Sequence, residues 1–147
     1  MPRAGARGKR EGKRLELVSV ERNAVRLFIE RHHSHHHRPN TWIASVGVAA
    51  DGELACVAVL ERPKARMLCD SKTAEVARVA SDGTPHVASK ALAAITRAAI
   101  ALGYTRLVSY TLLGESGTSY RAAGWWPTAT SGGGAWDRPS RPRTVRD

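Results

Sequence analysis

The chain has few large aromatic side chains, few cysteines and no long apolar run. Among its 147 residues there are one Phe, three Tyr and two Cys. Two cysteines are too few for a disulfide framework, so we expect Cys56 and Cys69 to be reduced thiols in or near the core. No stretch is apolar over the roughly 20 residues that a membrane-spanning helix needs, and no signal peptide is evident. These absences predict a cytoplasmic protein without a membrane segment.

The positive charge is concentrated at the two ends of the chain. The formal net charge is +10; residues 1–14 hold six Lys or Arg against one Glu, and residues 137–147 hold four Arg against two Asp. We therefore predict a disordered basic arm over residues 1–13, a single domain over 14–137 and a basic tail over 138–147. Short basic arms suit the phosphates of DNA, and they also serve solubility alone.

The hydrophobic pattern predicts a mixed α/β domain. Asp51-Gly52 between two apolar runs is a strong hairpin signal, and the Ala-rich segment 87–102 has helical spacing and ends at Gly103. Such a helix between two strands makes a right-handed crossover, so the strands should be parallel. In chain order we expect strand 14–20, helix 21–33, strands 41–50 and 53–61, strand 72–81, helix 87–102, strand 105–111, helix 116–123 and a hairpin of 125–130 with 134–136.

The spacing of side chains also predicts which faces of these elements are buried. In helix 21–33 the residues expected on one buried face are Ala24, Val25, Phe28 and Ile29. In helix 87–102 they are Val87, Leu92, Ile95, Ala99 and Leu102. In strand 72–81 we expect one face to carry Glu75, Ala77 and Val79.

The segment Tyr104–Trp126 carries the most specific pattern. Its short helix reads Tyr120-Arg121-Ala122-Ala123-Gly124-Trp125, a Tyr-x-x-x-Gly-aromatic order. This order resembles the last motif of the GNAT acyltransferase superfamily, and the predicted order of elements is similar to the GNAT order. The resemblance implies a GNAT-like α/β fold: a mixed, mostly antiparallel sheet with a central β-α-β crossover and helices on both faces. It also implies a group-transfer activity.

The resemblance gives roles to three residues of this fold. Tyr120 holds the position of a general acid that protonates a leaving thiolate, and a phenol suits this role because its ordinary pKa is near that of a thiol. Tyr120 can equally serve packing alone. Glu75 holds the position of a general base, although a half-buried Glu paired with Arg78 would be structural instead. Ser119, next to Tyr120, is a third catalytic candidate.

The loop before helix 87–102 is the predicted donor site. In GNAT proteins the amides at this helix start hold the pyrophosphate of the donor, since free amides and the helix dipole attract anions. The usual Arg/Gln-x-x-Gly-x-Gly/Ala loop is absent, so acetyl-CoA and another acyl donor both stay open. The cofactor-binding candidates are Arg78, Asp82, Gly83, Thr84, Ser89 and Lys90. A capped helix start, with Thr84 as N-cap and Pro85 in the first turn, is compatible with this interpretation.

A histidine-rich run occupies residues 32–37. His32 and His36 are four residues apart, a spacing that puts two imidazoles on one helical face and can hold a transition metal such as iron or zinc. No other set in the chain completes a zinc site by known spacing, so substrate contact by His32, His33, His36 and Arg38, or a polar helix end without a ligand, are the alternatives.

Aromatic and cationic residues recur towards the C-terminus. Trp125, Trp126 and Trp136 precede an Arg-Pro-Ser-Arg run, and rings with arginines can stack on bases and pair with phosphates. We expect Trp125 to fill the core, because large aromatics dominate core burial. The further substrate-binding candidates are Tyr110, Trp136, Arg138 and Arg141.

Residues 14–143 also resemble a small family of GNAT-like proteins from phages and bacterial mobile elements. The likeness rests on the His-His-x-His-His run, the Asp-Gly-Thr loop, the Gly-Thr-Ser-x-Arg-Ala-Ala-Gly-Trp segment and the Arg-Pro-Ser-Arg tail. Their architecture is similar to that of phage DNA-modification proteins of the Mom type, which implies modification of adenine in DNA. The alternatives are an acetyl-CoA-dependent N-acetyltransferase that acts on a small amine or a protein, and an inactive fold that binds DNA through its basic surface.

Overall fold

The computed structural model describes residues 12–32, 42–110 and 118–127. Within these ranges the strands form one sheet in the order β1-β2-β3-β4-β5, and every neighbouring pair is antiparallel except β4 with β5. The predicted fold class and the parallel crossover are therefore confirmed. The elements are β1 (Leu15–Val18), α2 (Arg22–His32), β2 (Trp42–Ala50), β3 (Glu53–Glu61), the 3-10 turn η1 (Arg66–Leu68), β4 (Thr73–Ser81), α3 (Val87–Ala101), β5 (Arg106–Val108) and α4 (Thr118–Ala122).

The hairpin of β2 and β3 forms at the predicted turn. Asp51 and Gly52 both have positive φ, of 50° and 86°, as a two-residue turn of type I′ requires. The turn also holds the start of β1, because the Arg14 amide donates to the Asp51 carboxylate at 2.9 Å and the Asp51 amide donates to the Arg14 carbonyl at 2.8 Å. One sequence signal thus fixes the register of three strands.

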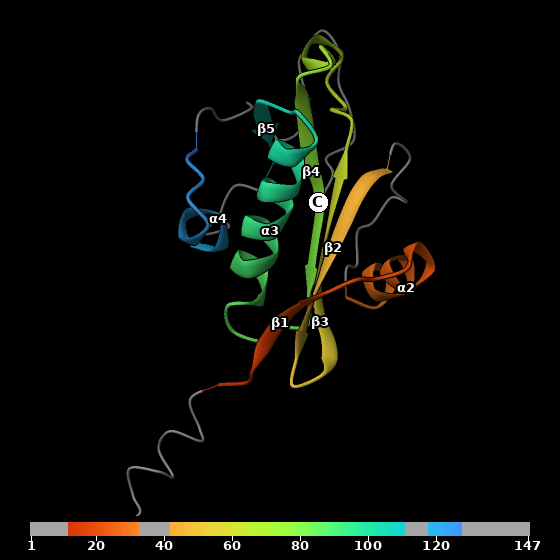
Figure 1. The fold of residues 1–147 in the computed structure, drawn as a ribbon, viewed down its shortest axis with the longest axis vertical. Coiled ribbons are helices and arrows are strands. Elements are labelled where there is room, and N and C mark those ends of the chain that lie inside the picture. Colours follow the sequence, from red (N-terminus) through yellow and green to blue (C-terminus); the bar gives the residue numbers. More distant parts are fainter. Residues whose placement is uncertain (1–11, 33–41, 111–117, 128–147) are drawn as a thin grey trace, which may run out of the picture.

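Helices cover both faces of the sheet, as Figure 1 shows with α3 and α4 on one side and α2 on the other. The cluster on the α3 side includes Leu60, Val76, Leu92 and Ile95. The smaller cluster on the α2 side includes Val25, Phe28, Ile29, Val57 and Val59. From Cys56 to Leu60 the residues of β3 alternate between these clusters, so this strand is buried on both faces, as its continuous apolar sequence predicts.

Strand β4 departs from the predicted alternation because it contains a bulge. Val59 pairs with Arg78 and Leu60 pairs with Val76, which leaves Ala77 without a partner on β3. Partners across a sheet share a face, so Glu75 and Arg78 both lie on the α2 side, although an odd separation would normally part them. The expectation that Glu75, Ala77 and Val79 share a face is wrong, since Val79 packs against the cluster under α3.

Helices α2 and α3 differ from the sequence prediction in three places. In α2 the buried residues are Val25, Phe28 and Ile29, whereas Ala24 is exposed. Leu102 is the C-cap of α3 and is 57% exposed, so it does not join the buried face. The N-cap of α3 is His86, with φ of 70°, and Thr84 makes no cap. The N-cap prediction fails because Thr84 bonds to Asp82 instead.

The two cysteines lie in different environments, and both are free thiols. Cys56 is in the core, where burial, and then the negative charge of Asp82, raise the pKa of its thiol to about 12. Cys69 is exposed and its Sγ donates to the Pro63 carbonyl at 3.2 Å. Cys56 should therefore be inert towards alkylating reagents that react with Cys69.

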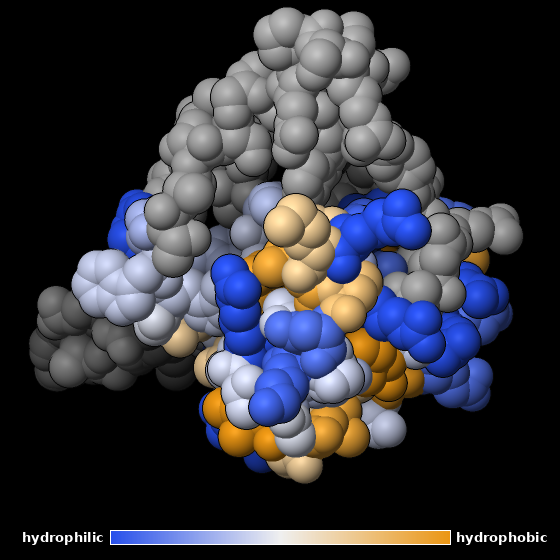
Figure 2. Space-filling model, turned by 90° about the horizontal axis from the view of Figure 1, so that it is seen from above, coloured by the Kyte–Doolittle hydropathy of each residue, from blue (hydrophilic) through white to orange (hydrophobic). Residues whose placement is uncertain are grey.

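The described surface includes no helix with the length and apolarity to cross a membrane. Seen from above in Figure 2, hydrophilic and apolar residues alternate over the coloured surface and do not form one apolar face. The predicted limits of the domain, the basic arm over 1–13 and the tail over 138–147 stay predictions, because residues 1–11 and 128–147 lie outside the described ranges. So does the predicted C-terminal hairpin beyond Pro127.

Candidate active site

The two parallel strands stop pairing a third of the way along β4. The recorded ladder runs from Thr73 with Arg106 to Glu75 with Val108, whereas β4 itself continues to Ser81. Over the described residues, β4 therefore has no second neighbour on this edge beyond Glu75. Strand edges carry N–H and C=O groups that seek partners, so this edge can accept an extended ligand.

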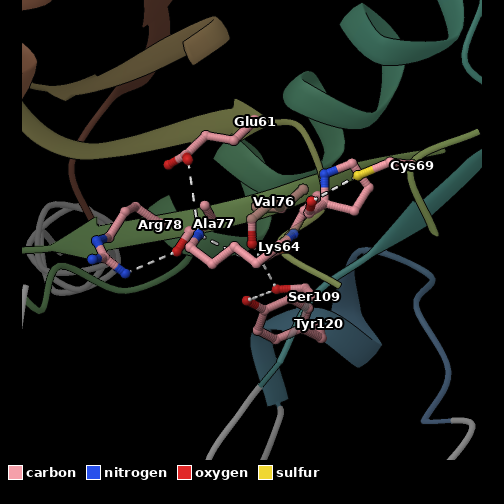
Figure 3. Close-up of polar contacts among 10 residues, drawn as sticks. Glu61, Lys64, Cys69, Val76, Ala77, Arg78, Ser109 and Tyr120 are labelled. Carbon is pink, nitrogen blue, oxygen red and sulfur yellow. Dashed lines mark hydrogen bonds and ion pairs between the residues drawn. The ribbon is translucent and has the colours of Figure 1, made fainter. Parts of the chain in front are cut away.

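Ser109 lies at the point where the strands part. Its Oγ donates to the Val76 carbonyl at 3.0 Å and lies 2.8 Å from the Tyr120 hydroxyl. A hydroxyl has one proton, and Ser109 gives its proton to a carbonyl that can only accept. Tyr120 is therefore the donor to Ser109, and the phenol is anchored to the edge of β4 through one hydroxyl (Figure 3).

The Tyr-x-x-x-Gly-aromatic order is a helix-ending motif in the structure. The Trp125 amide donates to the Tyr120 carbonyl at 2.8 Å and the Gly124 amide donates to the Arg121 carbonyl at 3.0 Å. This is the Schellman pattern, which requires a positive φ at the residue after the C-cap, and Gly124 supplies φ of 91°. The rings of Tyr120 and Trp125 meet edge to face at 5.5 Å. The predicted packing of Trp125 is thus confirmed, because it lies against the α3-side cluster.

Glu75 lies in a cluster of charges on the α2 side of the sheet. It pairs across the sheet with Glu61, and the two residues are 5% and 2% exposed. The Lys64 amide donates to Glu75 Oε1 at 2.9 Å, and Lys64 Nζ lies 3.6 Å from Glu75 Oε2 and 3.7 Å from Glu61 Oε1. Figure 3 shows Lys64 extended towards Glu61, while Ser109 and Tyr120 meet on the other side of β4.

Arg78 belongs to the same cluster and is not part of the donor loop. Its Nη1 donates to the carbonyl of the bulged residue Ala77 at 3.2 Å. Burial lowers the pKa of Arg78, and the negative charges of Glu61 and Glu75 partly oppose this effect. Arg78 thus interacts electrostatically with Glu61 and Glu75, and Lys64 adds contacts at 3.7 Å and 3.6 Å to the same two carboxylates.

Tyr110 lies near this cluster, one residue after Ser109, and is 46% exposed. Partial burial, and then the negative charge of Glu75, raise the pKa of Tyr110, whereas Arg106 opposes the shift. Its position beside Glu75 fits the predicted substrate contact. Ser119 is partly exposed, and its backbone carbonyl accepts a hydrogen bond from the Ala123 amide.

The loop before α3 is occupied by its own side chains. The Gly83 amide donates to Ser81 Oγ at 3.0 Å, and the Thr84 amide and hydroxyl donate to Asp82 Oδ1 at 2.9 Å and 2.7 Å. Burial opposes ionisation of Asp82, but the bonds from Thr84, with His32 and Lys13 nearby, hold its pKa below the usual value. The amides of Gly83 and Thr84 are thus engaged within the loop.

The first turn of α3 remains the part of this loop region suited to an anion. Amides in the first turn have no acceptor within their helix, and the helix dipole adds to their attraction for phosphate. Ser89 and Lys90 lie in this turn, where Ser89 Oγ donates to the His86 carbonyl at 3.1 Å and the Lys90 amide makes the first helical bond. The predicted cofactor-binding residues therefore fall into two groups. Asp82, Gly83 and Thr84 are hydrogen-bonded within the loop, whereas Ser89 and Lys90 lie in the first helical turn, which is suited to an anion.

The histidine prediction can be followed for one residue. His32 ends α2, where its ring lies 4.2 Å from that of Phe28, and its charge acts on Asp82. The described residues contain no group of three His, Cys, Asp or Glu that could hold a metal ion. The other members of the predicted histidine and tail sets lie outside the described ranges: His33, His36, Arg38, Trp136, Arg138 and Arg141.

The sequence prediction missed Glu61, Lys64 and Ser109. Ser109 immediately follows β5, so a hydroxyl at the end of the crossover was a usable signal. Glu61 and Lys64 flank the Arg62-Pro63 break after β3, but their approach to Glu75 depends on the register of β3 and β4, which the sequence does not reveal.

No protein-family model and no curated protein sequence matches the chain. Solved structures do. An aminoglycoside N-acetyltransferase, AAC(6')-Iy in complex with CoA, has a TM-score of 0.63 at 15% identity, over 83% of this chain and 94% of that one. The ribosomal-protein-S18-alanine N-acetyltransferase of Escherichia coli has a TM-score of 0.57 at 12% identity, over 76% and 77% of the two chains.

A third similar structure is an aminoglycoside acetyltransferase from an uncultured soil metagenomic sample, in complex with sisomicin. Its TM-score is 0.55 at 10% identity, over 80% of this chain and 90% of that one. At sequence identities this low, the structural similarity shows a shared fold alone. The chain has the fold of the GNAT acetyltransferases, with Ser109 and Tyr120 at the point where its parallel strands part.

Proposed function

We propose that the protein is an acyltransferase that moves an acyl group from a thioester donor to an amine. The observation that carries this proposal is the Ser109–Tyr120 hydrogen bond of 2.8 Å, beside the edge of β4 that β5 leaves uncovered. It places a phenol next to a strand edge that suits an extended donor. The fold supports the proposal, since three similar structures are acetyltransferases and one of them is a complex with CoA.

The reaction needs a base for the amine and an acid for the thiolate. Glu75 takes a proton from the attacking nitrogen as the C–N bond forms, and the C–S bond breaks with its electron pair on sulfur. The Tyr120 hydroxyl turns from Ser109 and gives its proton to that sulfur, and solvent restores the phenol. Each proton transfer of this kind contributes about 10²–10⁴-fold to the rate.

A donor of the CoA type fits part of this chain. The first turn of α3 suits a pyrophosphate, whereas Asp82 and the engaged amides of Gly83 and Thr84 do not. Weak binding of the donor's phosphates is therefore expected, with the acyl arm held mainly along β4. A different acyl thioester with a smaller anionic part is compatible with the same residues.

Release of free thiol from acetyl-CoA in the presence of an amine tests this proposal. The full chain should release thiol in proportion to acetylated amine, and Glu75→Gln should lower kcat by about 100-fold. Glu53→Gln is the matched control, because Glu53 is an exposed carboxylate at the start of the neighbouring strand β3. Absence of acyl transfer to every amine offered, with folded protein, contradicts the proposal.

The amino group of a nucleic-acid base is a second candidate acceptor. It is favoured by the net charge of +10, most of which lies in residues 1–14 and 137–147. Nucleosides from DNA of cells that express the protein should then include a mass-shifted deoxyadenosine that disappears with Glu75→Gln. Unmodified nucleosides alongside acetylated small amines would restrict the function to the first candidate.

A further inference from the structure

Two carboxylates face one another at the end of the β3–β4 ladder. Glu61 and Glu75 are direct cross-strand partners on the α2 side, and they are 2% and 5% exposed. Like charges opposite one another on neighbouring strands are destabilising, and buried charges persist where cations accompany them. The pair therefore needs a cation between its members.

Lys64 supplies a cation that is held loosely. Its Nζ lies 3.7 Å from Glu61 and 3.6 Å from Glu75, distances longer than the roughly 2.7–2.9 Å of a charge-assisted hydrogen bond. Its side chain is 44% exposed, whereas the carboxylates are buried. The Glu75 carboxylate is held independently by the Lys64 amide at 2.9 Å, so the ammonium can leave without releasing it.

The paired carboxylates lie beside the proposed reaction centre. Glu75 and Val108 form the last recorded pair of the β4–β5 ladder, and the next residues, Val76 and Ser109, connect to Tyr120. An ammonium between Glu61 and Glu75 would thus lie at the end of the strand edge proposed for the acyl donor.

We propose that Glu61 determines the specificity of the site for cationic amines and that Lys64 is its resident occupant. An acceptor ammonium takes the place of the Lys64 ammonium between the two carboxylates, and Lys64 moves into solvent. Glu61 then holds the bound ammonium while Glu75 takes one proton from it and passes that proton to solvent, and Glu75 takes the second proton as the C–N bond forms. This inference rests on the proposed function only in taking the bound amine to be the acyl acceptor. The binding of the amine can be measured without an acyl donor.

The binding experiment uses n-butylammonium chloride, which has the length and charge of a lysine side chain. Lys64→Ala removes one of the cations beside the carboxylates and leaves Arg78 in place, so millimolar n-butylammonium should fill the vacated position and raise the melting temperature of this variant. The double variant Glu61→Gln, Lys64→Ala should show no such rise. Sodium chloride at the same ionic strength and 1-butanol are the controls for screening and for apolar contact. An equal rise in both variants, or an equal effect of 1-butanol, overturns the proposal.

A second measurement applies if Lys64→Ala does not fold. In the otherwise unchanged protein, n-butylammonium competes with Lys64, so the NMR signal of the Lys64 amide, which donates to Glu75, should shift and saturate. The same titration of Glu61→Gln should not saturate. Saturation that Glu61→Gln leaves intact contradicts the proposal.

The activity experiment separates this inference from the proposed function. With n-butylammonium as acceptor, Glu61→Gln should raise KM about tenfold or more with little change in kcat, because a hydrogen bond to a charged group is lost. The KM for aniline, a neutral primary amine, should stay unchanged. Ammonium binding without acyl transfer to any amine supports the subsite and contradicts the function. Acyl transfer with the same KM in Glu61→Gln supports the proposed function and contradicts the subsite.

Discussion

The loop before α3 and the end of β5 differ in where their polar groups are directed. In the loop, Asp82 and Ser81 accept the amides of Gly83 and Thr84, so the loop satisfies itself. At the end of β5, Ser109 connects Tyr120 to the edge of β4. The fold thus keeps the Tyr120 phenol beside the parted strands, while two amides of the loop before α3 are already engaged.

This difference teaches that the two halves of the site can vary separately on one scaffold. In the proposed function, chemistry depends on a few side chains where β4 and β5 part, whereas the affinity for the donor's phosphates depends on backbone amides near the start of α3. Changes at Tyr120 or Ser109 should therefore act on kcat, and changes near Asp82 should act on donor KM or on stability alone.

The largest expected effect is that of Tyr120→Phe. Removal of the phenol proton should lower kcat by about 100-fold or more, while the ring contact with Trp125 is kept. Single-turnover release of thiol from acetyl-CoA measures this step. The matched control is Tyr104→Phe, a partly buried tyrosine that packs on the same core. A kcat for Tyr120→Phe equal to that of this control would remove Tyr120 from the chemistry.

A smaller loss is expected for Ser109→Ala. This change leaves the Val76 carbonyl without its donor and frees the phenol to rotate, so kcat should fall about tenfold, equivalent to about 1.4 kcal/mol. Ser109→Thr keeps the hydroxyl and should restore most of the rate. Ser109 is a positioning residue, and failure of Thr to restore the rate would indicate that bulk and not the hydroxyl matters at this site.

The third prediction compares two glycines directly. Gly124 and Gly83 have φ of 91° and 94°, and neither has an atom within 4 Å of an added Cβ. Substitution by Ala should therefore cost each site about 1 kcal/mol through backbone strain alone. Gly124→Ala should also lower kcat, because its turn orients Tyr120, whereas Gly83→Ala should change only the KM for the donor. Thermal melts and steady-state kinetics of both variants check this, and a kcat effect of Gly83→Ala would contradict the separation.

The elements of the fold could be predicted because their signals are local. Asp51-Gly52 specifies a hairpin by its turn geometry, and the spacing of Leu92 and Ile95 specifies a buried helical face. The bulge at Ala77 could not be predicted, since it arises from the pairing of β4 with β3 and reverses which residues share a face with Glu75. The N-cap prediction failed for a related reason: Thr84 donates its amide and its hydroxyl to Asp82, and His86 takes the N-cap position.

The candidate site was predictable only where a motif fixes its own geometry. Tyr120 and Gly124 belong to one helix-ending turn, so their sequence pattern and their structure coincide. Glu61, Lys64 and Glu75 come from three segments that meet through strand register, and their meeting has no local signal. The sequence thus pointed to Tyr120 and Glu75 as candidates for the acid and the base, and the structure shows what surrounds them.

The smallest expected effect is the pH dependence of stability at Asp82. Because the folded-state pKa of Asp82 is lowered, its carboxylate stabilises the folded loop above the unfolded pKa of about 3.9, and this contribution is lost as the pH falls through the folded value. Asp82→Asn should therefore melt below the unchanged protein at pH 7, and the difference should close in acid. Thr84→Val removes one donor to the carboxylate. When both proteins also carry Thr84→Val, the difference in melting temperature between Asp82 and Asp82→Asn at pH 7 should therefore be smaller. A difference that stays constant from neutral to acid pH would show that the Asp82 charge does not hold the loop closed.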